Sequence, residues 1–323
     1  MSPEPHPAEL SAPPVPLLRK QLGRLGLRVI AGVTLAGLLV RLLTGDRWPV
    51  LATLFYATPL PLLVVGSAVS LIGNLARGQR AWSLVWCVLL LGTAGACWQR
   101  DFERQSPQEL SGDEIRVMFW NAARQQDMTD AAAFINRVDA DVVGLVEAGR
   151  AQPEHRRFWA EHCPEYDVSF LGGGLILLVK GTSGETVPGD LGYESFYRRI
   201  PVRVRDREFM CVVVDLKSDP LYPRGPVLGK LAADMSEFHE QPLVVMGDFN
   251  TPSDSIHYAA LRESHREAFE SAGHGYSPTW PYPWPVMTLD QMWLNGKVDV
   301  LQCERVAPVH SDHFAVLSWL QLL

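Results

Sequence analysis

Apolar and polar positions divide the chain into two parts of different character. Residues 27–43, 48–75 and 82–98 are three long apolar stretches, each near or above the roughly 20 residues that a helix needs to cross a bilayer. From residue 113 onward, short apolar runs alternate with helical patterns and turn residues. We therefore predict an all-α transmembrane region of three helices, followed by a separate folded domain.

The flanks of the apolar stretches favour a membrane location. Trp48, Trp82 and Trp98 lie near the ends of the stretches, where amphipathic rings prefer the bilayer interface. A buried helical hairpin of a soluble protein is the alternative interpretation. Such a hairpin would have almost no polar surface, because the charged residues at positions 29–98 are only Arg41, Asp46, Arg47, Arg77 and Arg80.

The distribution of Lys and Arg predicts the orientation of the protein. Six of these residues flank the stretches on the amino-terminal side and four on the opposite side, and the richer side usually faces the cytoplasm. We expect a multi-pass protein of the cell membrane whose carboxy-terminal domain is extracytoplasmic. Residues 1–26 are a predicted disordered tail rich in Pro and basic residues, and residues 99–112 are a tether to the domain at 113–323.

The net charge of −7 is distributed unevenly along the 323 residues. Residues 1–110 have 10 Lys and Arg against 6 Asp and Glu, whereas residues 111–323 have 19 against 30, a net charge of −11. A duplex-binding domain usually gathers basic residues. Nucleic acid is therefore a disfavoured partner, although an acidic protein can carry a local basic groove.

The domain is predicted to contain strands and helices in alternation. The runs that predict strands are residues 115–120, 141–146, 175–180, 209–216, 243–249, 287–294 and 314–320. Helical patterns lie between them, at residues 129–138, 153–162, 227–239 and 255–264. About 210 residues of this kind are expected to form one α/β or α+β domain.

Polar side chains lie at the ends of several of these strands. Asn121 follows the first strand directly and Glu147 follows the second. The others are Asp248 with Asn250, Asp290, and the pair Asp312 and His313. An Asn or Asp in such a place is commonly a turn former or a helix cap, but Glu147 has no obvious role of that kind. Because a sheet builds a rigid site from polar groups at the mouths of buried strands, we expect these side chains to share one site.

Read in order, five segments resemble motifs of the endonuclease/exonuclease/phosphatase superfamily of metal-dependent phosphoesterases. They are Val117-Met118-Phe119-Trp120-Asn121, Asp141-Val142-Val143-Gly144-Leu145-Val146-Glu147, Val245-Met246-Gly247-Asp248-Phe249-Asn250, Leu289-Asp290-Gln291-Met292-Trp293 and Ser311-Asp312-His313. The resemblance covers residues 113–323 and implies an α+β fold, a four-layer α/β/β/α sandwich of two packed sheets flanked by helices. It also implies hydrolysis of a phosphoester at one end of the sheets.

The residue types are suited to a divalent metal ion. Glu147 offers hard oxygen atoms, and Mg²⁺ needs only one or two protein carboxylates because it keeps several waters. The resemblance implies that Asn121 helps to position Glu147 and the metal shell, and that Asp312 is a further ligand or supports one. Mg²⁺ is the predicted cofactor, with Mn²⁺ as an alternative.

The resemblance also implies roles for the remaining polar residues. Asp248 would orient or deprotonate the attacking water, and Asn250 would donate to a phosphate oxygen. His313, held and kept protonated by Asp290, would stabilise the pentacovalent phosphorane. A carboxylate partner favours this role because it raises the pKa of an imidazole and selects its tautomer.

One position departs from the superfamily pattern. Asp215 stands where most members have a His in the strand before a long loop. A carboxylate is a poor proton donor at neutral pH, so we expect Lys217 or Arg224 to take over contact with the substrate's phosphate or leaving group. The alternative is that Asp215 marks lost or redirected activity, in which case the chain is a degenerate scaffold.

Two features narrow the substrate class. The tether is short, so the site stays near the bilayer surface. The segment 280–285 alternates aromatic residues with Pro, and it either rests on lipid, shapes the pocket or packs on the domain as a surface loop. The architecture is similar to that of bacterial membrane phosphoesterases that include teicoplanin-resistance proteins, which implies a polyprenyl pyrophosphate as substrate.

The leading hypothesis is a membrane-anchored, Mg²⁺-dependent phosphoesterase that acts on a phosphorylated small molecule or lipid, with no protein partner predicted. A membrane-tethered endo- or exonuclease is the first alternative, and it would nick a plasmid. A catalytically degenerate membrane scaffold is the second, and it would not bind Mg²⁺.

Overall fold

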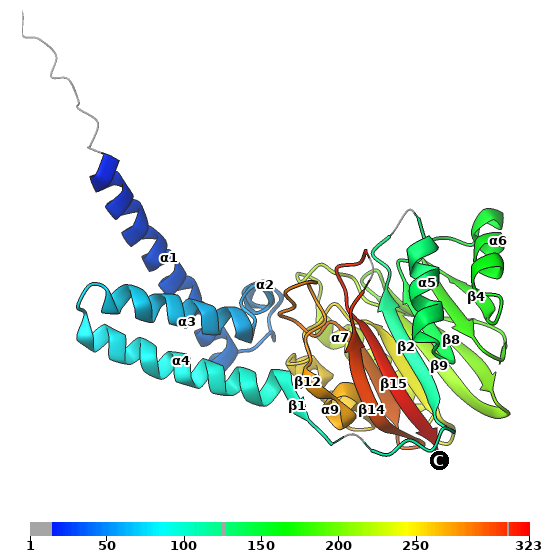
Figure 1. The fold of residues 1–323 in the computed structure, drawn as a ribbon. Helices are drawn as coiled ribbons and strands as arrows, with labels where there is room; N and C mark the ends of the chain where they lie inside the picture. The colour runs from blue at the N-terminus through cyan, green and yellow to red at the C-terminus, as the bar shows by residue number, and fades with distance from the viewer. Residues whose placement is uncertain (1–14, 107, 125–126, 309) are drawn as a thin grey trace, which may run out of the picture.

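The computed structural model describes residues 15–323 except residues 107, 125–126 and 309. Four helices, α1 (Val15–Leu43), α2 (Pro49–Ala57), α3 (Leu60–Leu75) and α4 (Arg80–Asp101), precede the folded domain (Figure 1). The predicted disordered tail lies outside the described residues as far as residue 14. Residues 15–26, assigned above to that tail, form the first turns of α1. The last Pro of the tail is Pro16, and the Leu, Arg, Lys and Gln residues that follow it favour a helix.

The middle apolar stretch is not one straight helix. It breaks at Thr58 and Pro59 into α2 and α3, whose axes are bent by 63°. Pro59 lacks a backbone N–H and disfavours helical geometry in the residue before it, which ends α2. Two helices, Gln21–Leu43 within α1 and Arg80–Asp101, are long and apolar enough to cross a membrane, and the bent pair would be a third if it acts as one span.

The folded domain contains two large sheets and one small one. The first has the order β14 (Val298–Val306), β15 (Ala315–Leu322), β2 (Ile115–Asn121), β3 (Val142–Val146), β5 (Leu175–Val179) and β4 (Asp167–Gly172). The second has the order β11 (His265–Glu267), β13 (Asp290–Asn295), β10 (Leu243–Asp248), β9 (Arg207–Asp215), β8 (Ser195–Val204) and β6 (Thr182–Ser183), and β7 (Val187–Gly192) pairs with β8. In the small sheet, β1 (Phe102–Arg104) pairs with β12 (His274–Tyr276).

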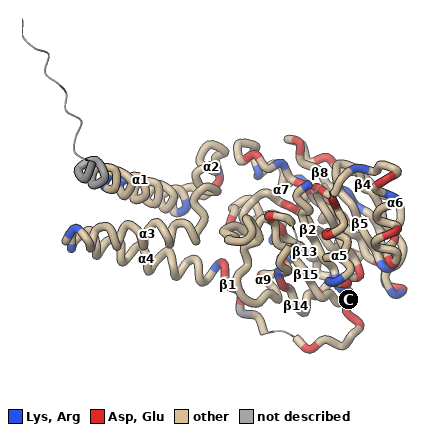
Figure 2. The backbone as a smooth tube through the Cα atoms, turned by 45° about the horizontal axis from the view of Figure 1, so that its top comes forward, with Lys and Arg blue, Asp and Glu red and all other residues tan. Residues whose placement is uncertain are grey.

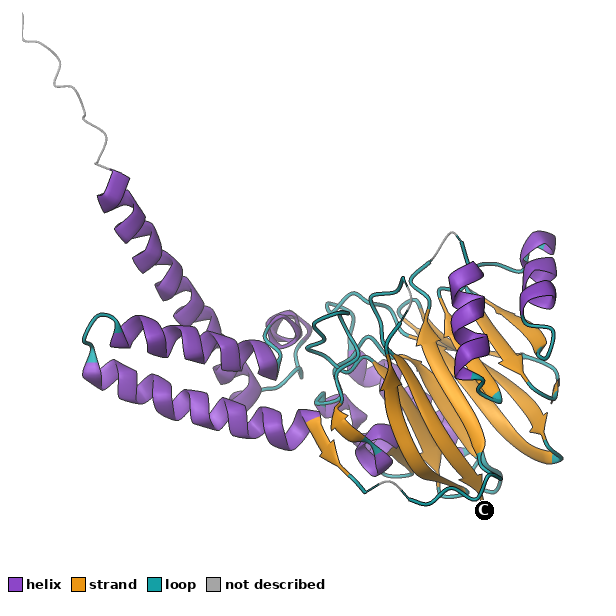
Figure 3. Cartoon of the chain, viewed as in Figure 1, coloured by secondary structure: helices purple, strands orange, loops and turns teal. Residues whose placement is uncertain are grey.

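Helices cover the outer faces of the two sheets (Figure 3). α5 (Thr129–Val138) and α6 (Pro153–His162) bury their apolar faces on the first sheet, and α7 (Arg224–Ser236) does so on the second. The short helices η1 (Ile256–Tyr258), α8 (Ala259–Arg262) and α9 (Ala268–Ala272) complete the domain. The α+β fold with an α/β/β/α sandwich is therefore confirmed.

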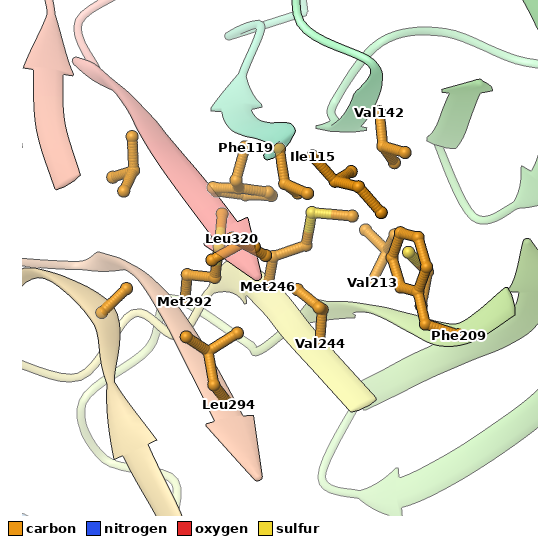
Figure 4. Packing of buried hydrophobic residues seen from close by; sticks show 14 of the residues in the cluster. Ile115, Phe119, Val142, Phe209, Val213, Val244, Met246, Met292, Leu294 and Leu320 are labelled. Carbon is orange, nitrogen blue, oxygen red and sulfur yellow. The ribbon is translucent and has the colours of Figure 1, made fainter. Parts of the chain in front are cut away.

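Apolar side chains from both sheets interdigitate between them (Figure 4). Phe119 and Val142 of the first sheet face Val213, Val244 and Met246 of the second, and none of these five is exposed to solvent. Removing a buried Phe side chain typically costs about 3–5 kcal/mol, because contacts are lost and a cavity remains. This core holds the two sheets at a fixed separation and angle.

The apolar pattern does not predict β7, β8 or β14. β8 carries Arg198, Arg199 and Arg203 and also Pro201, so its residues alternate between buried and accessible rather than forming an apolar run. Its pairing with β9, from Phe196 to Val204, determines its conformation. Such pairing between strands is invisible to a search for short apolar runs.

The helices dock onto the domain instead of standing clear of it. Arg41 of α1 donates to the carbonyl oxygens of Phe55, at 3.0 Å, and Thr58, at 2.9 Å, and it forms an ion pair with Asp254 of the domain. Asp254 is largely buried, so this ion pair is shielded from solvent. Arg41 thereby fixes the end of α2 against the domain.

The connection from α4 to the domain is also ordered in part. The predicted tether contains β1, which pairs with β12 in antiparallel register. The ring of Phe102 packs on that of Tyr276 with 5.0 Å between their centroids. Backbone pairing and ring packing therefore hold the end of α4 against the domain.

At Gly247 of β10, the backbone comes very close to the neighbouring strand β9. A Cβ atom at this position would lie 2.3 Å from the carbonyl oxygen of Val214 in β9, and that backbone atom cannot move without disturbing the sheet. We expect Gly247→Ala to lower the free energy of unfolding by about 1–3 kcal/mol, the usual cost of overpacking. Denaturation of the full chain in detergent, followed by tryptophan fluorescence, measures this change.

Gly229→Ala is the matched control. Gly229 lies inside α7, and a Cβ atom there would meet nothing within 4 Å. Removing a helical Gly should stabilise the protein by up to about 1 kcal/mol. Equal stability of the Gly247→Ala variant and the parent would contradict the close β9–β10 approach.

Candidate functional site

Parallel pairing of β2 and β3 brings the first two predicted residues together. Asn121 is the last residue of β2 and lies opposite Val146, so it is beside Glu147, which follows β3. Glu147 has a φ of 55°, a left-handed conformation that costs a non-Gly residue about 1–2 kcal/mol. Backbone hydrogen bonds from Arg124 N to Glu147 O and from Ala148 N to Gly174 O hold it.

The second sheet ends in three carboxylates at the same edge. Asp248 closes β10, lying opposite Asp215 of the parallel β9 and opposite Asp290 of the antiparallel β13. Asp248 accepts hydrogen bonds from Asn250 N and from Asn121 Nδ2, each at 2.9 Å. The second of these bonds joins the two sheets.

Burial and like charge dominate the electrostatics of Asp248. The residue is only 3% exposed. Its burial, and then the negative charge of Asp290, raise the pKa of its carboxyl group from 3.8 to about 7. Burial and the charge of Glu147 likewise raise the pKa of Asp215 to about 6. The site therefore gathers more negative charge than its own residues neutralise.

His313 provides the positive group of the site. It lies just before β15, and its Nδ1 atom is 2.9 Å from Asp290 Oδ2 and 3.1 Å from Oδ1. Burial lowers the pKa of the imidazole, but the charge and hydrogen bond of Asp290, with Asp248 and Asp312, outweigh burial and raise it to about 9. His313 is consequently an imidazolium at neutral pH, with Nδ1 donating to Asp290.

A cavity of about 340 Å³ collects most of the predicted residues. Its polar lining consists of Asn121, Glu147, Asp248, Asn250, Asp312 and His313, together with Ser218. Asp290 is 1% exposed and lies behind His313. Residues that are up to 192 positions apart in the sequence, Asn121 and His313, thus face one space.

Three other predicted residues lie outside the lining of this cavity. Lys217 Nζ donates to Glu194 Oε2 at 2.6 Å on the surface. Arg224 is 2% exposed and donates through Nη2 to the backbone oxygen of Asn250 at 3.1 Å. Of these two predicted phosphate contacts, Lys217 is engaged elsewhere and Arg224 lies behind the Asn250 loop.

Asp215 lines a second cavity, of about 590 Å³, which shares Glu147 with the first. Arg124 and Arg150 lie in the same cavity, and Arg124 Nη2 is 2.9 Å from Glu147 Oε1. Glu147 therefore separates a cavity that contains His313 from one that contains Asp215.

Sequence reasoning missed Tyr56 of α2, which lines the first cavity. Within an apolar stretch this residue has no pattern that marks it as functional. The available signal is that it is the only Tyr among the first 110 residues. The same cavity is also lined by Pro220, Trp280, Met287 and Leu289.

The donor set is suited to a divalent cation. Asp248, Asp290 and His313 each offer a ligand atom within 4.8 Å of the others, among the residues that the structure describes. Because His313 Nδ1 is already bound to Asp290, the carboxylate and amide oxygens that line the cavity are the better donors for a hard ion. Burial and the negative charge of Asp290 raise the pKa of Asp248, and a cation there would offset the charge of Asp290.

Comparison with known structures supports the architecture. An endonuclease/exonuclease/phosphatase from Bacteroides vulgatus has 18% identity and a TM-score of 0.53, with 65% of this chain and 99% of that chain covered. A mannosyl-6-phosphatase from Bacteroides thetaiotaomicron has 15% identity and a TM-score of 0.54, with 64% of this chain and 100% of that chain covered. The human Nocturnin catalytic domain with bound sulfate has 17% identity and a TM-score of 0.52, with 68% of this chain and 97% of that chain covered. At these identities the likeness shows the fold alone.

A search of curated protein sequences gives no significant match. The sequence profile of the endonuclease/exonuclease/phosphatase family matches residues 118–313, more than half of the chain. Members of this family are hydrolases of phosphoester bonds and typically depend on a divalent metal ion. The match spans the strand ends that bear Asn121, Glu147, Asp248 and His313. The chain therefore belongs to the endonuclease/exonuclease/phosphatase family.

Proposed function

We propose that the protein is a membrane-anchored, Mg²⁺-dependent phosphoesterase that hydrolyses a lipid-linked phosphate, such as a polyprenyl pyrophosphate, by in-line attack of water. The observation that carries this proposal is the cavity in which Asn121, Glu147, Asp248 and His313 meet beside helix α2. Its polar groups suit phosphoester hydrolysis, and the adjoining helices suit a substrate that resides in a membrane.

In the proposed mechanism, Asp248 activates the attacking water. This carboxylate is held by Asn121 Nδ2 and by the backbone N–H of Asn250, so its orientation is fixed. It accepts a proton from the attacking water, as a positioned general base does. The side-chain amide of Asn250 is oriented by a hydrogen bond to Leu216 O at 2.8 Å and donates its second N–H to a phosphate oxygen.

His313 stabilises the charge that develops on the phosphoryl oxygens. Asp290 engages Nδ1, so the Nε2 proton is the one that the imidazolium can present to a phosphate. A donor that is already oriented needs no rearrangement as negative charge builds up. Asp290 acts through His313 and is a positioning residue.

Glu147, Asn121 and Asp312 would hold the Mg²⁺ ion. When bound, the ion neutralises nonbridging oxygens and the leaving oxyanion. Asp312 is 53% exposed in its side chain and accepts from Trp280 Nε1 at 2.9 Å, so it is oriented toward the cavity mouth.

The carboxylate at position 215 favours a particular leaving group. Asp215 replaces the imidazole of most superfamily members, and Lys217 is paired with Glu194. Without a ready proton donor, a phosphate leaving group is easier to expel than an alkoxide, because it is the weaker base. Position 215 therefore favours a diphosphate over a simple alkyl phosphate as the substrate.

The helical region supports membrane anchoring. Charged residues are sparse along α1, α3 and α4 and numerous on the domain (Figure 2). Large apolar side chains of these helices are exposed, among them Leu39, Val65, Ile72, Leu84 and Leu91. We propose that α1, α3 and α4 cross the bilayer, with the amino terminus in the cytoplasm and the domain outside.

Removal of the metal ion or of its main ligand should abolish activity. We expect phosphate release from a panel of lipid-linked and soluble phosphate esters to stop with EDTA and to return with Mg²⁺. Glu147→Gln should lower kcat/KM by at least about 100-fold, since loss of a charge-stabilising group costs several kcal/mol. Glu194→Gln is the control, because Glu194 also has a left-handed backbone, with φ of 59°, but lies outside the first cavity. Full activity in EDTA would refute the metal assignment.

Asp290→Asn should lower kcat much more than it raises KM. The variant keeps the size of the side chain but can no longer orient and stabilise the imidazolium, a change that costs about 10²–10⁴-fold in kcat in comparable carboxylate–histidine pairs. Steady-state kinetics on the same panel measures the split. Asp299→Asn, which alters an exposed ion pair with Arg266, should leave both constants unchanged. A normal kcat for Asp290→Asn would exclude the positioning role given to Asp290.

A reporter that matures only outside the cytoplasm tests the proposed orientation. Alkaline phosphatase fused after Leu323 should be active in cells, because three crossings place the domain opposite the amino terminus. A reporter that is active only in the cytoplasm, fused at the same point, should be silent. The reverse pair of results would place the catalytic domain inside.

A further inference from the structure

Helix α2 forms part of the cavity that contains His313. It lies at the domain end of the helical region, beside the loop that follows β12 (Figure 1). Tyr56 of α2 lines the cavity together with Trp280, Met287 and Leu289 of that loop. α2 precedes residues 118–313, the part of the chain that the family profile matches, so this contribution is a feature of the chain's own helical region.

Hydrogen bonds fix Tyr56 relative to the domain. Its hydroxyl group donates to Asp46 Oδ2 at 3.2 Å. Asp46 is 2% exposed, and its Oδ1 accepts from Ile256 N of the domain at 3.1 Å. The guanidinium of Arg224 faces the same hydroxyl and donates to Asn250 O at 3.1 Å. The ring of Tyr56 is thus held in a defined position next to the Asn250 loop.

Arg41 secures the last turn of α2, the turn that carries Tyr56. It binds the carbonyl oxygens of Phe55 and Thr58, the last turn of the helix, and its guanidinium lies 4.0 Å from the centre of the Phe55 ring. The ion pair with Asp254 joins this arrangement to the domain. α2 therefore cannot leave the cavity without breaking these polar contacts of its last turn.

The lining of the cavity is amphipathic. Carboxylates, amides and the imidazole of His313 line it together with Tyr56, Pro220, Trp280, Met287 and Leu289, and Trp280 Nε1 donates to Asp312. Met287 also lines a small gap beside Pro59 and Leu60 at the start of α3, which Arg41 and Asp254 line as well, so the cavity adjoins the helical region there. An amphiphile fits the lining of the cavity, with its phosphate against the polar groups and its chain against the apolar ones.

We propose that Tyr56 is a specificity-determining residue that, with Trp280 and Met287, holds the first carbons of the apolar chain of a lipid-linked diphosphate. The helical region then completes the active site as well as anchoring it. This inference rests on the proposed function, since it names the substrate class of the same cavity.

Two diphosphates that differ in chain length test the inference. Methyl diphosphate and farnesyl diphosphate share a head group but carry one and fifteen carbons, respectively. With the full-length protein in detergent and Mg²⁺, we expect kcat/KM for the farnesyl compound to be at least about tenfold higher, since each buried methylene contributes about 0.8 kcal/mol. Phosphate release is the readout.

Variants at position 56 separate apolar contact from structural support. Tyr56→Ala should bring the ratio of the two kcat/KM values close to unity, because the ring that contacts the chain is lost while the two substrates keep the same head group. Tyr56→Phe should keep the chain-length preference, since the ring remains. Val50→Ala is the control on the same helix, because Val50 is 76% exposed. Partition of substrate into detergent is the same for all variants and cancels from the comparison.

The other outcomes distinguish the inference from the proposed function. If the parent protein hydrolyses no phosphate ester in the panel with Mg²⁺, the proposed function itself fails. If it hydrolyses esters but shows no preference for the farnesyl chain, or if Tyr56→Ala keeps that preference, the inference alone is overturned. If Tyr56→Ala lowers kcat/KM equally for both diphosphates, Tyr56 has only a structural role and the inference is overturned. If the parent protein cleaves a single-stranded oligonucleotide faster than farnesyl diphosphate, Tyr56 and Trp280 contact bases instead of a lipid chain, which also overturns it.

Discussion

The hydrogen bond from Asn121 Nδ2 to Asp248 Oδ2 joins the two sheets at the edge where the site forms. It is possible only because the core between the sheets sets their separation and because both residues end their strands at the same edge. A buried hydrogen bond to a charged group contributes about 1.5–3 kcal/mol. This bond links the position of the end of β2 in one sheet to that of the end of β10 in the other.

Concentrated negative charge is the cost of this arrangement. Asp248, Asp290 and Asp215 meet at the ends of neighbouring strands, and burial prevents water from screening their repulsion. His313 offsets part of it through its pair with Asp290. The rest is what makes the site suitable for a divalent cation and a phosphate, because such a cation is stabilised where protein charges repel one another.

The helical region and the family domain are joined by buried polar contacts as well as by sequence. Arg41, Asp46 and Tyr56 each make a polar contact with the domain or with a residue that does. Charged and hydroxyl groups in apolar helices are costly unless they are paired, so their positions at the domain end of the helices are explained by this docking. The helices and the cavity thus form one structural unit.

Local pattern in the sequence determined much of the molecule. Apolar length predicted the helical region, strand-forming runs predicted the central strands β2, β3, β9 and β10, and polar residues at strand ends predicted the members of the cavity. These features depend on neighbours along the chain, and apolar periodicity is sufficient to reveal them. Asn121, Glu147, Asp248, Asn250, Asp312 and His313 could therefore be grouped without coordinates.

Only the tertiary structure decided the rest. Strand β8 depends on its pairing with β9, Lys217 is drawn away by Glu194, and Arg224 lies behind Asn250. Tyr56 enters the cavity because Pro59 breaks the apolar stretch and Arg41 docks α2 on the domain. Each of these outcomes depends on contacts between residues far apart in sequence, and the chain's packing selects among contacts that local pattern leaves equally possible.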